Sequence, residues 1–231
     1  MTRLSIIVPT LNEVDGIAEA LGMLAPLRKR NVEVIVADGG SEDSTVALAR
    51  PFCDRVVSAA RGRGAQLTAG ASAAKGDVFL FLHADTRLPP DADLALLSRF
   101  AGSGYAWGRF DVRIVGKHPL LPLVAIGMNL RSRLTGIATG DQAMFVTRDA
   151  FWAVGGFPDI ALMEDIALSR ELKRLGRPLC LRARVTTSGR RWDERGFVRT
   201  VLLMWRLRLA YYFGASPERL ARMYGYVPRK E

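Results

Sequence analysis

Short apolar runs alternate with helical patterns along the first half of the sequence, and no other feature constrains the fold as strongly. Residues 4–8, 32–37 and 77–82 are short, largely apolar runs with the length of buried strands, and each is followed by a stretch with helical spacing. Strands that alternate with helices at this distance form βαβ units. The sequence therefore predicts an α/β fold with a mixed, mostly parallel, Rossmann-like sheet flanked by helices.

The pattern changes after residue 100. Residues 105–115 alternate between apolar and polar side chains over part of their length, which is typical of an antiparallel or edge strand. A helix is expected over 119–135, a strand over 142–146 and a second helix over 166–175. Since no low-complexity linker interrupts the chain, we expect one domain at 1–190 and a C-terminal extension at 191–231.

Composition excludes several classes of protein. With 49% hydrophobic residues the chain is not disordered, and its two cysteines, Cys53 and Cys180, belong to no disulfide framework or zinc-ligand cluster. No apolar run reaches the ~18 residues of a membrane span. The chain also enters its first strand without the pattern of a signal peptide, so we expect a cytoplasmic protein.

Polar side chains follow three of the expected strands at the point where each strand ends. Glu13 follows the first strand, Asp38 follows the second, and His83 and Asp85 follow the strand at 77–82. Ligands of open α/β sheets bind beyond the carboxyl ends of the strands. Some of these side chains would serve equally well as helix N-caps, but acidic groups after all three strands favour a binding site at this edge.

Two common nucleotide-binding loops do not occur in the sequence. The first strand leads into PTLNE at 9–13 rather than a G-x-G-x-x-G turn, and the isolated GRG at 62–64 lies elsewhere in the chain. The pattern G-x-x-x-x-G-K-[ST] is absent as well. Dinucleotide and P-loop chemistry are therefore excluded.

Four segments resemble the motifs of family 2 glycosyltransferases, which have the GT-A fold. They are VPTLNE at 8–13, VADGGSEDST at 36–45, FLHAD at 81–85 and MED at 163–165, and the similarity extends over about 4–180. More narrowly, GRGAQ at 62–66 and TGDQA at 139–143 resemble a short bacterial subgroup assigned to arsenosugar-type biosynthesis. The resemblance implies that the domain at 1–190 is a GT-A glycosyltransferase domain.

This resemblance implies inverting transfer of a sugar from a UDP- or GDP-sugar to a hydroxyl group. Asp165 would be the general base, with Glu164 beside it at the start of a helix. Asp85 would be the last residue of the D-x-D motif and would hold Mg²⁺ or Mn²⁺ against the diphosphate. The residues expected to bind the nucleotide and the donor sugar are Pro9, Thr10, Glu13, Asp38, Arg63, Gly64, Asp85, Asp141 and Gln142.

The chemistry of such a transfer agrees with these residue types. A departing nucleoside diphosphate gathers negative charge, which a hard cation held by carboxylates stabilises, and the attacking hydroxyl must give its proton to a base. The sequence departs from the motif at His83, which replaces the first Asp of D-x-D. Two roles for His83 are open, as a second metal ligand or as a hydrogen-bond donor to a phosphate.

Several of these residues have a purely structural alternative. Glu164 and Asp165 would also stabilise the N-terminus of a helix through its dipole. Asp141 and Gln142 would also be typical of a solvated loop. Asp111, on the alternating segment, is expected at the surface.

The net charge of +10 is concentrated in the last quarter of the chain. Residues 170–231 contain 16 Lys and Arg against 5 Asp and Glu, whereas residues 1–169 are close to neutral. Such a block favours anionic partners, with a solvated basic surface as the alternative.

Residues 196–213 have the pattern of a basic amphipathic helix that carries Trp and Tyr. Arg199 and Arg206 share one face of this helix, and Arg208 lies nearly opposite. Two arrangements are open: the helix lies in a membrane interface, or it packs on the domain while its arginines reach solvent. The first would place the protein peripherally at the inner face of the membrane, where a lipid-linked acceptor would be found.

Two functions from different classes are consistent with these patterns. The first is a metal-assisted glycosyltransferase with a nucleotide-sugar donor. The alternative is a non-catalytic binding module whose basic extension docks on a membrane surface or nucleic acid. Nucleic acid is disfavoured, because the extension lacks helix-turn-helix and glycine-aromatic patterns.

Overall fold

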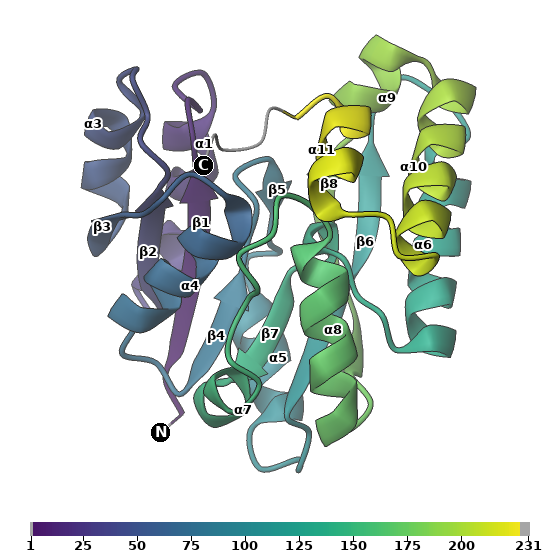
Figure 1. Ribbon diagram of the computed structural model, residues 1–231. Coiled ribbons are helices and arrows are strands. Elements are labelled where there is room, and N and C mark those ends of the chain that lie inside the picture. Colours follow the sequence, from purple (N-terminus) through teal and green to yellow (C-terminus); the bar gives the residue numbers. More distant parts are fainter. Residues whose placement is uncertain (1, 227–231) are drawn as a thin grey trace.

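The computed structural model describes residues 2–226 and contains one eight-stranded sheet with helices on both faces (Figure 1). Its strands are ordered β3-β2-β1-β4-β7-β6-β8-β5. They span Leu4–Thr10 (β1), Glu33–Asp38 (β2), Arg55–Ser58 (β3), Val78–Phe81 (β4), Thr86–Arg87 (β5), Trp107–Val115 (β6), Met144–Thr147 (β7) and Leu179–Ser188 (β8). Neighbours from β3 to β4 are parallel, as are β6 and β8, whereas β7 is antiparallel to both of its neighbours. The predicted α/β class and mostly parallel sheet are confirmed.

Eleven α-helices and two short 3-10 helices, η1 (Arg50–Phe52) and η2 (Gly140–Gln142), connect the strands or follow them within the described residues. The α-helices span Ile17–Gly22 (α1), Ala25–Arg28 (α2), Thr45–Ala49 (α3), Arg63–Ala73 (α4), Ala92–Phe100 (α5), Leu121–Thr135 (α6), Arg148–Ala153 (α7), Glu164–Leu175 (α8), Arg190–Arg195 (α9), Phe197–Tyr212 (α10) and Pro217–Tyr224 (α11).

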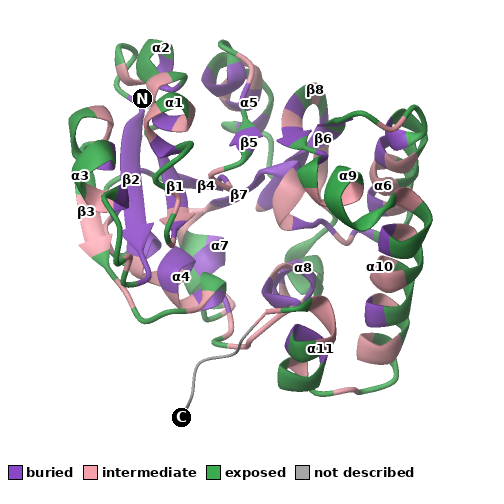
Figure 2. Ribbon diagram, turned by 90° about the horizontal axis from the view of Figure 1, so that it is seen from above, coloured by how far each residue is buried: buried purple, intermediate pink, exposed green. Residues whose placement is uncertain are grey.

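Alternate residues of the central strands enter two separate cores, one on each face of the sheet. On β1, Ile6 packs with residues of α1, α2, α5 and α6, and the adjacent Ile7 packs with residues of α4, α7 and α8 (Figure 2). Every residue of β2 is buried. A strand covered on both faces is apolar throughout, which explains why β1, β2 and β4 are recognisable as continuous apolar runs.

The second half of the sheet differs from its prediction in two respects. β6 was expected as an antiparallel or edge strand, and it is antiparallel to β7 but lies inside the sheet, because β8 pairs along its other side. β8 itself was not predicted from the sequence. Its residues are buried, half-buried or exposed in turn, since several of them are Arg or Thr, and this pattern lacks the apolar run of the other long strands.

Of the three C-terminal helices, α10 and α11 pack on the beginning of α8, and α9 contacts α11. Met163 and Ile166 form a third core cluster with Leu207 of α10 and Leu220 of α11. Arg195 of α9 donates a hydrogen bond to the carbonyl oxygen of Tyr224, at the end of α11, over 2.9 Å. These helices therefore form one wall beside α8 (Figure 1). No helix within residues 2–226 has the length and hydropathy needed to cross a membrane.

Candidate active site

The carboxyl ends of β1, β2 and β4 lie at one edge of the sheet, as the parallel order requires. A pocket at this edge, here called the strand-end pocket, is lined by Pro9, Thr10, Glu13, Arg63, Gln66, His83, Asp85 and Glu164, among others. The charge of Asp85 acts directly on Glu13: burial, and then this negative charge, raise the pKa of Glu13. Two acidic groups from different strand ends are therefore neighbours here.

Gln66, on α4, fixes the floor of the strand-end pocket. Its amide nitrogen donates hydrogen bonds to the carbonyl oxygens of Thr10 (2.7 Å) and Ala37 (3.0 Å), and so joins the ends of β1 and β2. Beside these contacts the hydroxyl of Thr10 is buried and has no hydrogen-bond partner among the described residues. An unpaired buried hydroxyl is a group that a bound ligand would satisfy.

Asp38 and Gly64, both predicted to bind the donor, do not line the strand-end pocket. The carboxylate of Asp38 accepts hydrogen bonds from the backbone of Gly40 and Ser41 (both 3.0 Å) and from the Ser41 hydroxyl (2.5 Å), so its own loop occupies it. Gly64 lies against the chain at Pro158, because a Cβ at Gly64 would be 2.4 Å from the Pro158 carbonyl oxygen. Both residues shape the loops around the pocket instead of facing it.

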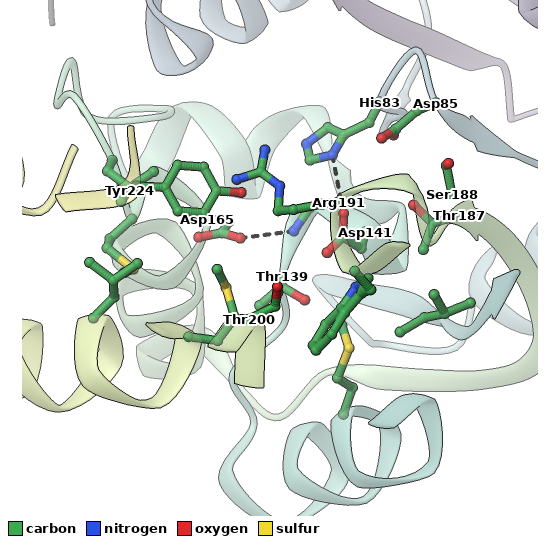
Figure 3. A pocket seen from close by; sticks show the side chains of 18 of the residues that line it. His83, Asp85, Thr139, Asp141, Asp165, Thr187, Ser188, Arg191, Thr200 and Tyr224 are labelled. Atoms are coloured by element: carbon green, nitrogen blue, oxygen red, sulfur yellow. Dashed lines mark hydrogen bonds and ion pairs between the residues drawn. The ribbon is translucent and has the colours of Figure 1, made fainter. Parts of the chain in front are cut away.

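A second pocket adjoins the first and is here called the α8 pocket. It is lined by residues of the N-terminal turn of α8, of η2 and of the C-terminal helices (Figure 3). The residues that it shares with the strand-end pocket include Arg63, His83, Asp85, Glu164, Arg190, Arg191 and Tyr224. The two have volumes of about 270 and 260 Å³. Together they fall within the range of roughly 300–1,000 Å³ that is typical of small-molecule sites.

Asp165 is held in the α8 pocket by backbone hydrogen bonds. Its Oδ2 accepts from the Gly140 N–H over 2.9 Å and its Oδ1 from the Ile166 N–H over 2.7 Å (Figure 3). Burial, and then the negative charge of Glu164, raise the pKa of Asp165, while the Gly140 hydrogen bond and Arg63 act against them. The carboxylate is thereby a stronger base than an ordinary aspartate.

Glu164 lies in both pockets but serves a different partner. Its carboxylate is 3.1 Å from the guanidinium of Arg63, at the start of α4. Burial lowers the pKa of Arg63, but Glu164, together with Tyr224, Asp165 and Asp141, outweighs this effect and keeps the pKa above its usual value. The ion pair therefore fixes a positive charge at the boundary between the two pockets.

Met163, immediately before these two acids, has a left-handed backbone with φ of 74°. Residues other than glycine adopt this conformation only where their surroundings impose it, typically at a cost of about 1–3 kcal/mol. The side chain of Met163 is buried in the cluster formed with α10 and α11. Packing of the C-terminal helices thus holds the turn from which Glu164 and Asp165 project.

His83 faces Asp141 rather than Asp85. Its Nδ1 is 3.5 Å from the Asp141 carboxylate, and the far side of its ring lies against Gly140, where a Cβ would be 2.3 Å from Nε2 (Figure 3). The interaction with His83, helped by Arg63 and Arg208, overcomes desolvation and lowers the pKa of Asp141. Within residues 2–226 no three His, Cys, Asp or Glu side chains are arranged as a metal site.

Of the remaining residues considered in the sequence, one lines the α8 pocket and two are buried away from it. Asp141 lines the α8 pocket, whereas Gln142 is buried and donates a hydrogen bond to Asn129 over 3.2 Å. Asp111, expected at the surface, is instead buried between Arg109 and Arg133. That expectation was wrong because the alternating pattern does not reveal that arginines flank the carboxylate on both sides.

Several pocket residues were not identified as site residues from the sequence. They are Arg190, Arg191, Arg208 and Tyr224, and the guanidinium of Arg191 lies 4.0 Å from the centre of the Tyr224 ring. No motif spacing marks them. The one available signal was the position of Arg208 on the face of its helix opposite Arg199 and Arg206, which is the face that turns toward the pocket.

Comparison with known proteins gives one family match and several relatives. The sequence model described as "Glycosyl transferase family 2" matches residues 5–155. An undecaprenyl-phosphate 4-deoxy-4-formamido-L-arabinose transferase of Pseudomonas savastanoi pv. phaseolicola is 27% identical over 161 residues, which cover 59% of this chain and 44% of that protein. The chain spans less than half the length of the curated relatives it matches.

Solved structures match the fold over most of the chain. A mannosyltransferase of Pyrobaculum calidifontis in complex with GDP-Man and Mn²⁺ has a TM-score of 0.67 at 22% identity, covering 90% of this chain and 61% of that chain. Glucosyl-3-phosphoglycerate synthase of Mycobacterium tuberculosis, in complex with Mg²⁺ and UDP, has a TM-score of 0.64 at 22% identity, covering 99% and 81%. At these identities the likeness concerns the fold, which is the GT-A fold of nucleotide-sugar transferases.

Proposed function

The chain belongs to glycosyl transferase family 2 and is a sugar-transferring enzyme, and from this premise we propose that it moves a sugar from a nucleoside diphosphate donor to an acceptor hydroxyl with inversion. The observation that carries the proposal is that Asp85 and Asp165, far apart in sequence, line the same α8 pocket. One lies at the end of a central strand and the other at the start of α8. Inverting transfer needs one group that binds the diphosphate and a different group that acts as the base, both within one site.

The strand-end pocket would hold the nucleotide. Pro9, Thr10 and Glu13 line it, and the unpaired buried hydroxyl of Thr10 offers a hydrogen bond to the base or the ribose. Arg63, fixed by Glu164, stands where the diphosphate would pass from this pocket into the next. Relatives solved with UDP or with GDP-Man support either nucleotide.

A divalent cation fits this site through Asp85. The Asp85 carboxylate is exposed and has one long hydrogen bond, from the Thr86 hydroxyl over 3.3 Å, so oxygen atoms remain free. Mg²⁺ is often held by one or two carboxylates together with substrate phosphates and water, so the lack of a three-ligand cluster in the described residues agrees with this mode. His83 does not fit as a ligand, because it is engaged with Asp141 and Gly140. When bound, the cation would stabilise negative charge on the leaving diphosphate.

Asp165 would remove the proton from the acceptor. As the acceptor oxygen forms its bond to the anomeric carbon, the bond from that carbon to the diphosphate oxygen breaks, and the hydroxyl proton passes to the Asp165 carboxylate. Its raised pKa suits it to this task. Since the reaction is a single displacement, no second carboxylate is required as a nucleophile, and Glu164 remains the partner of Arg63.

A donor screen tests the proposal. The protein is incubated with UDP- and GDP-sugars, and release of nucleoside diphosphate is measured with Mn²⁺, with Mg²⁺ and with EDTA. In parallel, UDP or GDP at about a hundred times its dissociation constant is expected to stabilise the fold by about 2.7 kcal/mol. Thermal stability that responds to neither nucleotide, with or without Mn²⁺, would contradict the proposal and favour the non-catalytic binding module.

We further propose that α6 and α10 contact an anionic membrane surface, where a lipid-linked acceptor would be found. The two helices lie at the same side of the molecule (Figures 1 and 2), and their residues carry no Asp or Glu. Exposed large apolar side chains gather on them: Leu123, Ile126, Leu130, Leu134, Val198, Leu202, Trp205, Leu209 and Tyr212. This set is here called the α6–α10 apolar face. Arg199 and Arg206, both exposed, add the positive charge that phosphatidylglycerol would attract.

Co-sedimentation with vesicles tests the membrane contact. The protein is expected to bind vesicles that contain phosphatidylglycerol more strongly than vesicles of phosphatidylcholine alone. The double variant Trp205→Ser/Leu209→Ser should lose most of this binding, whereas Leu94→Ser, an equally exposed leucine on α5, should not. Equal binding by parent and double variant would remove this part of the proposal.

A further inference from the structure

Two arginines beside the α8 pocket have no partner among residues 2–226. Arg208, on α10, lines the pocket, and Arg131, on α6, lies close to it. Neither guanidinium makes a hydrogen bond or an ion pair with the described residues, and Nε and Nη2 of Arg131 are shielded from solvent. Burying an unpaired charge is unfavourable, so this arrangement is unusual.

Three other arginines are paired with carboxylates, and Arg191, whose Nη1 is likewise buried without a hydrogen-bond partner among the described residues, lies over the ring of Tyr224. Arg109 and Arg133 share the carboxylate of Asp111, and Arg63 is bound to Glu164. By contrast Arg208 acts on Arg131: burial, and then the positive charge of Arg208, lower the pKa of Arg131 to about 10, and burial lowers the pKa of Arg208 as well. Asp165 and Asp141 lie near enough to both guanidiniums to act against this effect. The two positive charges are therefore grouped next to Asp165 and are not neutralised by a direct partner.

We propose that Arg131 and Arg208 bind a phosphate group carried by the acceptor substrate. A guanidinium pair matches the charge and the several oxygen atoms of a phosphate. The inference rests on the proposed function, because it assigns a chemical class to the acceptor of that same site. The donor diphosphate is assigned elsewhere, to Asp85 and Arg63, which also line the strand-end pocket, whereas Arg208 lines only the α8 pocket of the two.

Because the two arginines lie beside Asp165, a phosphate bound to them would place the acceptor near the proposed base. In a soluble phosphate ester, the phosphate would rest on the two arginines and a nearby hydroxyl would give its proton to Asp165. In a lipid phosphate, an oxygen of the phosphate itself would attack. Since that oxygen has no proton to lose at neutral pH, this outcome would keep the phosphate site but remove the acceptor hydroxyl and the base role of Asp165 from the proposed function. Both substrates share the phosphate, and the test separates them.

Calorimetric titration measures the binding directly, without donor and in EDTA, so that no metal-bridged diphosphate site contributes. Glycerol 3-phosphate is compared with glycerol, and farnesyl phosphate with farnesol, the latter two in detergent micelles. We expect a phosphate compound to bind and its dephosphorylated counterpart to bind at least about tenfold more weakly. Arg208→Gln and Arg131→Gln should each lower the affinity for the phosphate compound about 10- to 100-fold, the usual effect of losing a hydrogen bond to a charged group.

Arg219→Gln, at an exposed arginine on α11 that lines neither pocket, is the matched control and should bind like the parent. Binding of glycerol 3-phosphate identifies a soluble acceptor, and binding of farnesyl phosphate alone identifies a lipid phosphate. No binding of either phosphate, or equal binding by parent and both arginine variants, overturns the inference. Because the titration uses no nucleotide, failure here leaves the donor screen unaffected, and the reverse also holds.

Discussion

Among single residues, Asp165 destabilises the fold when it is charged, and it is also the proposed base. Its carboxylate lies beside Glu164, and burial raises its pKa, so the folded protein binds a proton there more tightly than the unfolded chain does. The stability associated with this group is therefore greatest below the ordinary aspartate pKa, and it declines as the pH rises through the raised value. A base that destabilises the fold when charged is typical of a residue retained for function.

Asp165→Asn is expected to lower kcat by about 10²–10⁴ while the nucleotide still binds. At pH 7 its Tm should equal or exceed that of the parent, by roughly 2–4 °C for each kcal/mol of relieved repulsion. Rate assays and differential scanning calorimetry measure the two effects, and Asp149→Asn, an exposed acid on α7, is the control. In the parent, kcat should fall at acid pH with a midpoint above the ordinary aspartate pKa. A variant that transfers sugar at the parent rate would show that Asp165 is not the base.

Gly140 contacts both Asp165 and His83, and its lack of a Cβ makes room for the His83 ring. Its N–H donates to Asp165, and the ring of His83 occupies the place of the missing side chain. Gly140→Ala would bring the new methyl group to 2.3 Å from the ring, so His83 must move away from Asp141. We expect a loss of about 1–3 kcal/mol in unfolding free energy, as in other overpacked sites, together with reduced turnover. Urea titration measures the first, and an unchanged midpoint would contradict the contact.

At the scale of elements, α8 depends on the helices that follow β8. Leu207 of α10 is 1% exposed and packs against Met163 and Ile166 at the beginning of α8. Since Met163 holds a left-handed backbone, the loss of this packing would release the turn that carries Glu164 and Asp165. The C-terminal helices thus act on the site through packing as well as through the residues they contribute to the pocket.

Leu207→Ala is therefore expected to lower the unfolding free energy by about 2–5 kcal/mol, the usual effect of truncating a buried leucine. Turnover should fall as well, because Asp165 loses its fixed direction. Leu209→Ala, on the exposed side of the same helix, is the control and should change stability by less than about 0.5 kcal/mol. Chemical unfolding of both variants gives the comparison, and similar losses in the two would show that the cluster is not a core.

Strands buried on both faces could be predicted from the sequence, and so could helices such as α6 and α8, whereas the largely polar strand β8 could not. β1, β2 and β4 are continuous apolar runs because helices cover them on either side. β8 was not predicted because its arginines and threonines make it polar. It forms a strand because it pairs along β6. Backbone pairing between strands leaves no signature in the side chains of such a strand, so no strand was predicted there.

For the molecule as a whole, the acidic residues of the site could be predicted, whereas its arginines other than Arg63 could not. Glu13, Asp85, Glu164 and Asp165 belong to motifs whose order along the chain is informative. Arg131 and Arg208 come from two helices whose mutual approach is a property of the tertiary structure. Nor does the sequence reveal that the loop after β2 occupies the carboxylate of Asp38, because that depends on the path of the backbone.

The wall formed by the C-terminal helices has a consequence for how this enzyme could diversify. α10 packs on the beginning of α8 and lines only the α8 pocket of the two, through residues such as Thr200 and Arg208, whereas Pro9, Thr10 and Glu13 line the strand-end pocket and not the α8 pocket. Chimeras that exchange α10 (Phe197–Tyr212) between relatives should therefore inherit the nucleotide preference of one parent and the acceptor preference of the other. Such a division would let the specificity for the acceptor change during evolution while recognition of the nucleotide is retained.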